Sequence, residues 1–133
     1  MPTIYQQFQD LNGAEKAYLR NHPHHVLALK ESRSAAFAET QRRFGKNARN
    51  DKSDAFRHCF WSALLARELG YVNALAFTSA HENFPGNNIK EKQMDLHNNR
   101  AGLDIGRNKG SNAQLSTRCM AALQSGKLKI MVK

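Results

Sequence analysis

The chain has 133 residues and carries 20 Lys and Arg against 11 Asp and Glu, a formal net charge of +9. This length fits one domain with a sizeable core, so we predict a single domain over residues 1–133 and allow for flexible ends at 1–12 and 127–133. No apolar stretch approaches the ~20 residues of a membrane span, and we expect no conventional signal peptide. The positive charge favours an anionic partner such as nucleic acid, lipid headgroups or a cell-wall polymer.

Capping and helix-breaking residues divide the first part of the chain. Asn12 and Glu15 have the spacing of a capping box, which predicts a helix over residues 13–21. From Pro23 to Phe44, inward-facing positions recur every three or four residues, which predicts a second helix that ends at Gly45.

The residues that follow, 53–69, predict a central helix with Asp51 or Ser53 as its N-cap. Most of its residues are apolar on every side, which is typical of a buried helix. One stripe is polar, because residues at i, i+3, i+4 and i+7 share a helix face. The stripe consists of Asp54, Arg57, His58 and Trp61. Buried charges cost several kcal/mol unless they are paired, so the stripe is either a structural ion pair or part of a reaction centre.

Three more helices are expected after the central one. The first covers residues 72–82 and stops before the turn at Pro85 and Gly86. The second starts at about residue 91 or 95 and runs to 108, and the third covers 112–124 after Ser111 as its cap. We therefore predict an all-α, compact domain of five or six helices around the buried helix at about 53–69.

Two further polar segments lie on these later helices. His81 and Glu82 stand where one helix meets the Pro-Gly loop, and adjacent residues diverge by about 100°, so we expect one of them to face a shared site. The next helix places a polar group of residues on one face together with two glycines, which predicts the close approach of a ligand or another backbone. That face contains Asp95, Asn98, Asn99, Gly102 and Gly106. His97 points elsewhere unless Asp95 is the N-cap, in which case His97 joins the site.

Histidine and cysteine residues outside these segments have simpler interpretations. His22, His24 and His25 flank Pro23 and are interpreted as a surface cluster. Cys59 and Cys119 are expected to be buried thiols, with a disulfide between helices as the alternative in an oxidising compartment.

Histidines beside carboxylates suit general acid–base catalysis or a divalent metal site. We assign His58 and Glu82 as an acid–base pair, Asp95 as a metal ligand or as the group that orients a histidine, and Asn98 as the group that polarises the scissile bond. Arg57 is expected to bind a phosphate bidentately. If one divalent ion is bound, the candidate ligands are His58, His81, Asp95 and His97.

Three motifs together resemble a family of small bacterial domains that occur alone and at the ends of polymorphic toxins and secreted effectors. The motifs are DAFRHCFW at residues 54–61, HE at 81–82 and MDLHNNRAG at 94–102, and the resemblance covers about residues 10–107. Cys59 departs from the family, which more often has alanine there. The matching functional positions fall into two groups. We expect the catalytic residues to be His58, His81, Glu82, Asp95 and Asn98, and the substrate-binding residues to be Asp54, Arg57, Trp61 and Asn99.

The resemblance implies an antibacterial effector role and leaves the reaction open. It implies a cognate immunity protein and a secretion-system carrier as partners, with synthesis in the cytoplasm and export into a target cell without a signal peptide. Our leading hypothesis is a hydrolase of an anionic, phosphoester-containing substrate: phospholipid, a lipid-linked wall precursor or nucleic acid. The alternatives are a peptidoglycan-degrading glycosidase-type enzyme that uses Glu82 as its acid, and a basic binding module without catalysis.

Overall fold

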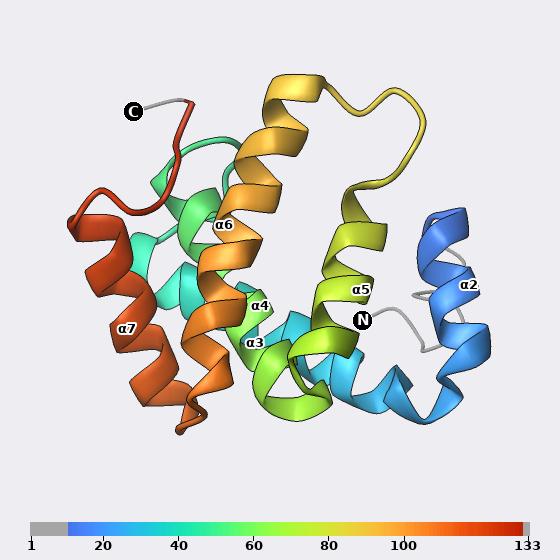
Figure 1. Ribbon diagram of the computed structural model, residues 1–133. Helices are drawn as coiled ribbons and strands as arrows, with labels where there is room; N and C mark the ends of the chain where they lie inside the picture. The colour runs from blue at the N-terminus through green and yellow to red at the C-terminus, as the bar shows by residue number, and fades with distance from the viewer. Residues whose placement is uncertain (1–10, 132–133) are drawn as a thin grey trace.

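Six α-helices make up most of residues 11–131, the part of the chain that the computed structural model describes (Figure 1). The helices are α2 (Gly13–Asn21), α3 (Val26–Phe44), α4 (Lys52–Leu69), α5 (Tyr71–Glu82), α6 (Ile89–Arg107) and α7 (Asn112–Gln124), and the short 3-10 helix η1 (Pro23–His25) joins α2 to α3. The predicted all-α fold is confirmed. Residues 1–10 of the expected N-terminal flexible end lie outside the described residues, as do 132 and 133.

Polar caps set the starts of these helices. Asn12 and Glu15 form the predicted capping box of α2, and Asp51 caps α4 by accepting from the amide of Asp54. The start of α6 differs from the prediction, because the Asn88 side chain accepts from two backbone amides and begins the helix at Ile89. Asp95 therefore lies inside α6, and the alternative in which it acts as the N-cap is wrong.

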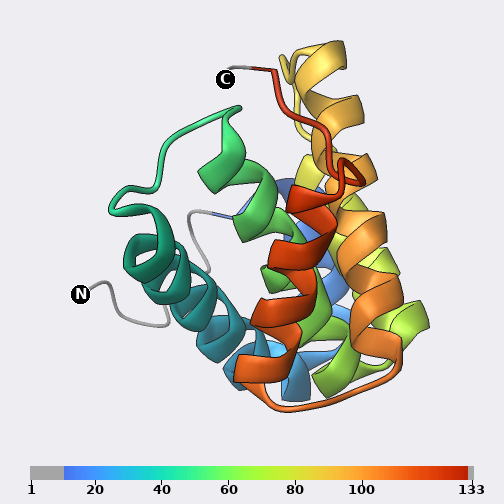
Figure 2. The ribbon, with the colours of Figure 1, turned by 90° about the vertical axis from the view of Figure 1, so that its left-hand side faces the viewer.

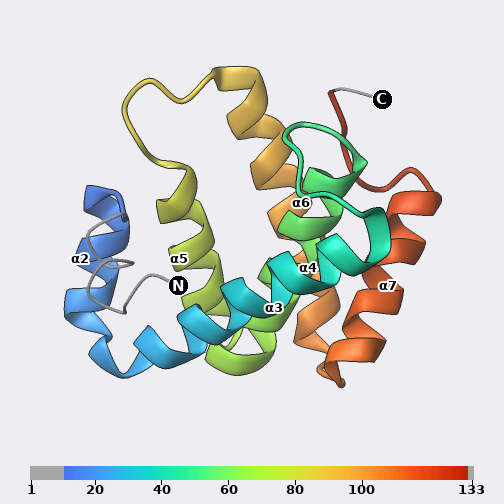
Figure 3. The ribbon, with the colours of Figure 1, turned by 180° about the vertical axis from the view of Figure 1, so that it is seen from behind.

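Helix α4 is the buried centre of the domain. Helices α5 and α6 pack on the side that faces the viewer in Figure 1, and α3 crosses the opposite side in Figure 3. Phe56, Phe60, Leu64 and Leu65 of α4 are each at most 1% exposed. The prediction of a buried central helix is confirmed.

The crossing of α4 and α6 is a direct backbone contact. A Cβ atom at Gly102 would lie 2.0 Å from the carbonyl oxygen of Cys59, and one at Gly106 would lie 2.1 Å from that of Ala63. Only glycine allows this approach, which explains two residues that would otherwise weaken the interior of α6. The expectation that another backbone approaches these glycines is confirmed.

The segment after α7 packs back against the domain (Figure 2). Leu128 is 7% exposed, Lys129 exchanges two hydrogen bonds with Asn98, and the amide of Met131 donates to the Asn50 carbonyl at 2.9 Å. Residues 127–131, within the C-terminal end that we expected to be flexible, thus contact the rest of the domain. Within residues 11–131, no helix combines the length and apolar character that crossing a bilayer requires.

The histidines around Pro23 are not all at the surface. His24 is exposed, but His25 is buried and its Nδ1 lies 2.8 Å from the hydroxyl of Tyr18. The rings of His22 and His25 stack with their centroids 5.0 Å apart. The surface-cluster interpretation is wrong for His25, because Tyr18 gives its ring a buried partner.

Candidate functional site

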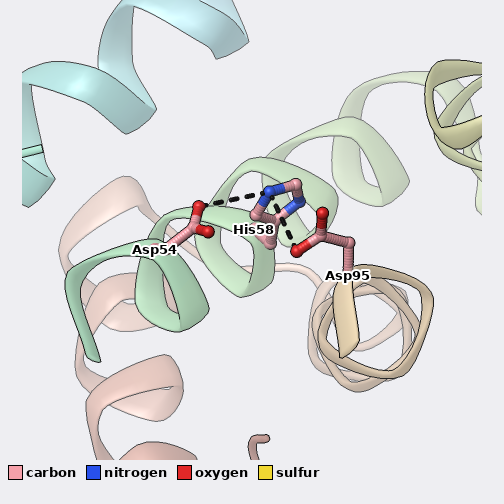
Figure 4. A group of neighbouring side chains, drawn as sticks. All are labelled: Asp54, His58 and Asp95. Carbon is pink, nitrogen blue, oxygen red and sulfur yellow. Dashed lines mark ion pairs between the residues drawn. The ribbon is translucent and has the colours of Figure 1, made fainter. Parts of the chain in front are cut away.

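His58 on α4 lies between carboxyl groups that come from three helices. Its Nε2 is 3.3 Å from Asp54 Oδ1 and 3.5 Å from Asp95 Oδ1, as Figure 4 shows. Its Nδ1 is 3.0 Å from Asn99 Oδ1 and 3.8 Å from Glu82 Oε2. All five side chains are buried or nearly so, and His58 itself is 13% exposed. The structure thus brings the three polar segments of the sequence together.

Two pairs of residues with the same spacing build this group. Asp54 and His58 stand four residues apart on α4, and Asp95 and Asn99 stand four residues apart on α6, so each pair shares one helix face. The glycine crossing holds these two faces against each other. Glu82 is the last residue of α5 and approaches from the third side.

The amide of Asn99 decides which nitrogen of His58 carries a hydrogen. Asn99 Nδ2 donates to Glu82 Oε2 at 3.4 Å, and Asn99 Oδ1 accepts from the hydroxyl of Ser62 at 3.2 Å. Because this oxygen is only an acceptor, His58 Nδ1 must donate to it. Nε2 is then the nitrogen whose protonation varies, and the two carboxyl groups that it faces favour a proton or a cation there.

The pKa values of the group reflect this crowding. Burial lowers the pKa of His58, but its hydrogen bond to Asp54 and the negative charges of Asp95, Asp54 and Glu82 outweigh burial and raise it to about 9. Burial raises the pKa of Asp95 to about 7, with further contributions from the charges of Glu82 and Asp54, although the charge of His58 opposes the rise. Asp95 Oδ1 is buried and has no hydrogen-bond partner within the described residues.

Asp54 is held in its ionised form by its neighbours. Burial alone would raise its pKa, but the hydrogen bond and charge of His58, the Asn50 amide and Arg57 together lower it below its ordinary value. The Asn50 amide donates to Asp54 Oδ2 at 2.7 Å, and an Nη2 hydrogen of Arg57 is donated to Oδ1. Asp54 is therefore a fixed negative charge, whereas Asp95 changes charge near neutral pH.

The guanidinium of Arg57 binds other groups of the protein. Besides Asp54, its guanidinium donates to the Ala48 carbonyl at 3.2 Å and to Asn47 Oδ1 at 3.3 Å, and it lies 5.1 Å from the centre of the Phe37 ring. These contacts fix the loop between α3 and α4. They use the guanidinium donors that a bidentate phosphate contact needs, so the structure does not place Arg57 as the phosphate clamp that we expected.

His81 lies at the edge of the group and has a partner that sequence reasoning missed. Its Nδ1 is 2.9 Å from Oε2 of Glu15, a buried residue of α2, and its ring lies 4.9 Å from Trp61 and 6.4 Å from His58, measured between ring centroids. The side chain of His81 is 43% exposed. Trp61 is buried, and its ring centroid lies 6.3 Å from that of His58, so the three rings form one cluster. Glu15 gave no signal beyond its capping-box spacing, because that spacing already explains a glutamate.

Asn98 and His97 do not join the group. The Asn98 amide binds both backbone atoms of Lys129, at 2.9 and 2.8 Å, and His97 Nε2 is 2.8 Å from the Lys127 carbonyl oxygen. Helix α6 turns Asp95 and Asn99 toward α4 and turns these two residues toward the C-terminal segment. The expected roles of Asn98 on the scissile bond and of His97 as a metal ligand are therefore corrected to structural contacts.

The central group has the composition of a metal site. Asp54, His58 and Asp95 each offer one ligand atom, and these atoms all lie within 4.8 Å of one another. One imidazole nitrogen with two carboxylates suits Mn²⁺, Zn²⁺ or Mg²⁺. The other nitrogen of a metal-binding histidine usually donates to a fixed acceptor, which Asn99 supplies here.

Fold and site together define an all-α domain in which three helices enclose a histidine among carboxyl groups. A family model described as a domain of unknown function, DUF6973, matches residues 16–127. The chain belongs to this family. A search of curated proteins and a search of solved structures each find no match.

Proposed function

We propose that the protein is a hydrolase of anionic, phosphoester-containing substrates and that it works with one divalent cation held by Asp54, His58 and Asp95. The observation that supports this proposal is the position of His58 Nε2 between two carboxylate oxygens, one of which, Asp95 Oδ1, has no hydrogen-bond partner in the described chain. A cation at this position would satisfy that oxygen and would take the place of the Nε2 proton.

The cation would supply Lewis-acid activation of a phosphoester oxygen or of a water molecule. The protein groups around it have distinct roles. Asn99 orients His58, and Glu82 orients Asn99 through its amide. Glu15 accepts the Nδ1 hydrogen of His81, which leaves His81 Nε2 as the nitrogen that gives or takes a proton at the exposed edge of the site. The net charge of +9 favours an anionic substrate.

The biological setting that we propose is that of an antibacterial effector. Its support is the resemblance of the three sequence motifs to domains at the ends of polymorphic toxins. Under this proposal the protein is carried by a secretion system into a target cell, and the producing cell makes an immunity protein that blocks it.

A second candidate is a metal-free acid–base hydrolase that degrades the cell wall. The pKa of Asp95, about 7, favours this candidate, because a carboxyl group that titrates near neutral pH can act as a general acid. In this version Asp95 takes the acid role that we first assigned to Glu82. A chelator separates the two candidates: it stops the metal-dependent enzyme and leaves the metal-free enzyme active.

The chain provides its own reporter for cation binding, because Trp61 is the only tryptophan and its ring centroid lies 6.3 Å from that of His58. Titration with Mn²⁺ should change the fluorescence of Trp61 in a saturable way. Loss of a charged ligand in Asp95→Asn should weaken binding by about tenfold or more. Asp104→Asn removes an exposed carboxylate from the same helix and should bind as wild type. Equal affinity in both variants, or no binding by wild type, would refute the metal site.

Activity is tested on a chromogenic phosphodiester and in cells. A chelator should stop hydrolysis, and Mn²⁺ should restore it. Because the cation replaces protons on His58 and Asp95, its affinity should rise with pH between about 7 and 9. Expression in the target compartment should arrest growth, and His58→Ala should remove the toxicity without unfolding the protein. A folded His58→Ala variant with full toxicity would contradict the proposal.

A further inference from the structure

In the loop that joins α5 to α6, residues 83–88, polar side chains contact the protein while an apolar side chain is exposed to solvent. Two of its three asparagines contact the protein: Asn87 Nδ2 donates to the Glu82 carbonyl at 2.8 Å, and Asn88 caps α6. Phe84 within the loop is 41% exposed, and Ile89 directly after it is 67% exposed. A turn at Gly86, where φ is +80°, separates the two. The loop is thus shaped by inward polar contacts and presents apolar groups to the solvent.

A third exposed apolar residue belongs to the same end of the domain. Met131, 46% exposed, is linked through Asn50 to Glu91 in the first turn of α6. In Figures 1, 2 and 3, which are related by rotation about the vertical axis, the 83–88 loop and the C-terminal segment both stand at the top. Phe84 belongs to this loop, Ile89 follows it and Met131 belongs to the C-terminal segment, and we call the end of the domain that carries these residues the apical surface.

The charged residues around the apical surface are mainly cationic. Lys52 and Lys90, in the first turns of α4 and α6, and Lys129 of the C-terminal segment are exposed. Two acidic residues at the starts of these helices are paired with cations, Glu91 with Arg49 at 2.6 Å and Asp51 with Lys46 at 3.1 Å. Exposed apolar side chains surrounded by lysines match an anionic lipid surface, where apolar groups enter the headgroup region and lysines contact the lipid charge.

We infer that the apical surface docks on a membrane that contains anionic phospholipid. The site is tied to this surface, because the Glu82 carboxylate lies in the site while its carbonyl anchors the loop. Docking would therefore hold the site at the level of the lipid headgroups. Resting on the proposed function, this inference narrows the substrate class to a phosphoester in a lipid headgroup.

Nucleic acid fits the apical surface less well. Nucleic-acid interfaces are polar and strongly cationic, and outward aliphatic residues such as Ile89 and Met131 offer them no favourable contact. Scattered exposed apolar residues are ordinary, and Val72, 77% exposed at the start of α5, is one of them. Val72 lies at the opposite end of α5 from the loop and provides a matched control.

The test is co-sedimentation with vesicles of phosphatidylcholine alone and of phosphatidylcholine with phosphatidylglycerol. Wild type should sediment with the anionic vesicles and much less with the neutral ones. Phe84→Ser combined with Ile89→Ser should weaken binding by about tenfold or more, because two apolar side chains no longer leave water. Lys90→Glu should weaken it by about fivefold or more, and Val72→Ser should bind as wild type.

Each result decides between alternatives. No sedimentation of wild type, or an equal loss in Val72→Ser, overturns the inference. If the protein binds duplex DNA but not vesicles, and the changes at Phe84 and Ile89 leave DNA binding unaffected, its partner is nucleic acid instead of a membrane. Vesicle binding and the metal site are tested separately. Asp95→Asn should still sediment with anionic vesicles, and the variant changed at Phe84 and Ile89 should still bind Mn²⁺. Failure of one proposal is thus distinguishable from failure of the other.

Discussion

Replacing Asp95 with asparagine should stabilise the protein, and the gain should grow with pH. The fold raises the pKa of Asp95 from an ordinary 3.8 to about 7. A group whose pKa is raised by folding contributes most to stability at low pH, and this contribution is lost as pH rises from the unfolded toward the folded value. Asparagine cannot ionise, so the variant avoids this loss.

The size of the effect follows from the pKa. Each pKa unit corresponds to about 1.4 kcal/mol, so the interval from pH 5 to pH 7 sets an upper limit of about 3 kcal/mol. The Asp95 side chain is 15% exposed and lies 3.5 Å from His58 Nε2, so relaxation and water reduce the effect. We expect the variant to gain about 1–2 kcal/mol more at pH 8 than at pH 5. Comparing two pH values cancels the changes in packing and hydrogen bonding that asparagine itself causes.

Urea denaturation followed by circular dichroism at pH 5 and pH 8, with a chelator present, measures this difference. Asp104→Asn on the same helix is the control and should show no comparable dependence on pH. A gain that is equal at the two pH values, or larger at pH 5, would show that Asp95 is not buried among negative charges as the structure describes.

Three other experiments test the packing. Gly102→Ala places a methyl group 2.0 Å from the Cys59 carbonyl oxygen, so the free energy of unfolding in urea should fall by at least about 2 kcal/mol. Gly13→Ala is the control, because its methyl group meets nothing within 4 Å and should change the free energy of unfolding by less than about 0.5 kcal/mol. Cys59 and Cys119 are fully buried and burial raises the pKa of the Cys119 thiol, so DTNB should label both only in urea; rapid labelling of the native protein would contradict this burial. Asn12→Ala removes the cap of α2 and two hydrogen bonds to the end of α5, and should lower the melting temperature through a loss of about 1–2 kcal/mol; an unchanged melting temperature would argue against these bonds.

Local chemistry was enough to predict most of the helix ends, with the start of α6 at Ile89 as an exception. Asn12, Ser111 and Gly45 end or begin helices as expected, because capping depends on residues within one turn. The glycines at 102 and 106 were also interpretable, since their cost in a helix requires a close neighbour. The sequence also predicted that the segments of His58, Glu82 and Asp95 meet, from polar clusters on otherwise apolar helices.

The errors arose where one helix face meets two partners. Asn98 and Asn99 are adjacent, and the pattern of α6 alone does not tell which contacts α4 and which contacts the returning C-terminal segment. Glu15 and His81 are 66 residues apart, and their contact depends on how α2 packs on α5. Such contacts depend on how the helices pack against one another, and the residue periodicity within one helix does not specify that packing.

The contact between α4 and α6 at Gly102 and Gly106 sets the distance between the residues of the site, and this contact involves none of those residues. Asp54 and His58 lie on α4 and Asp95 lies on α6, so the distance between these side chains depends on how closely the two backbones touch at residues 102 and 106. A side chain added at either glycine would push α6 away from α4 and move Asp95 away from His58 without replacing any residue of the site. Under the proposed metal site, such a variant would change the size of the cation that fits, although none of the proposed ligands is mutated.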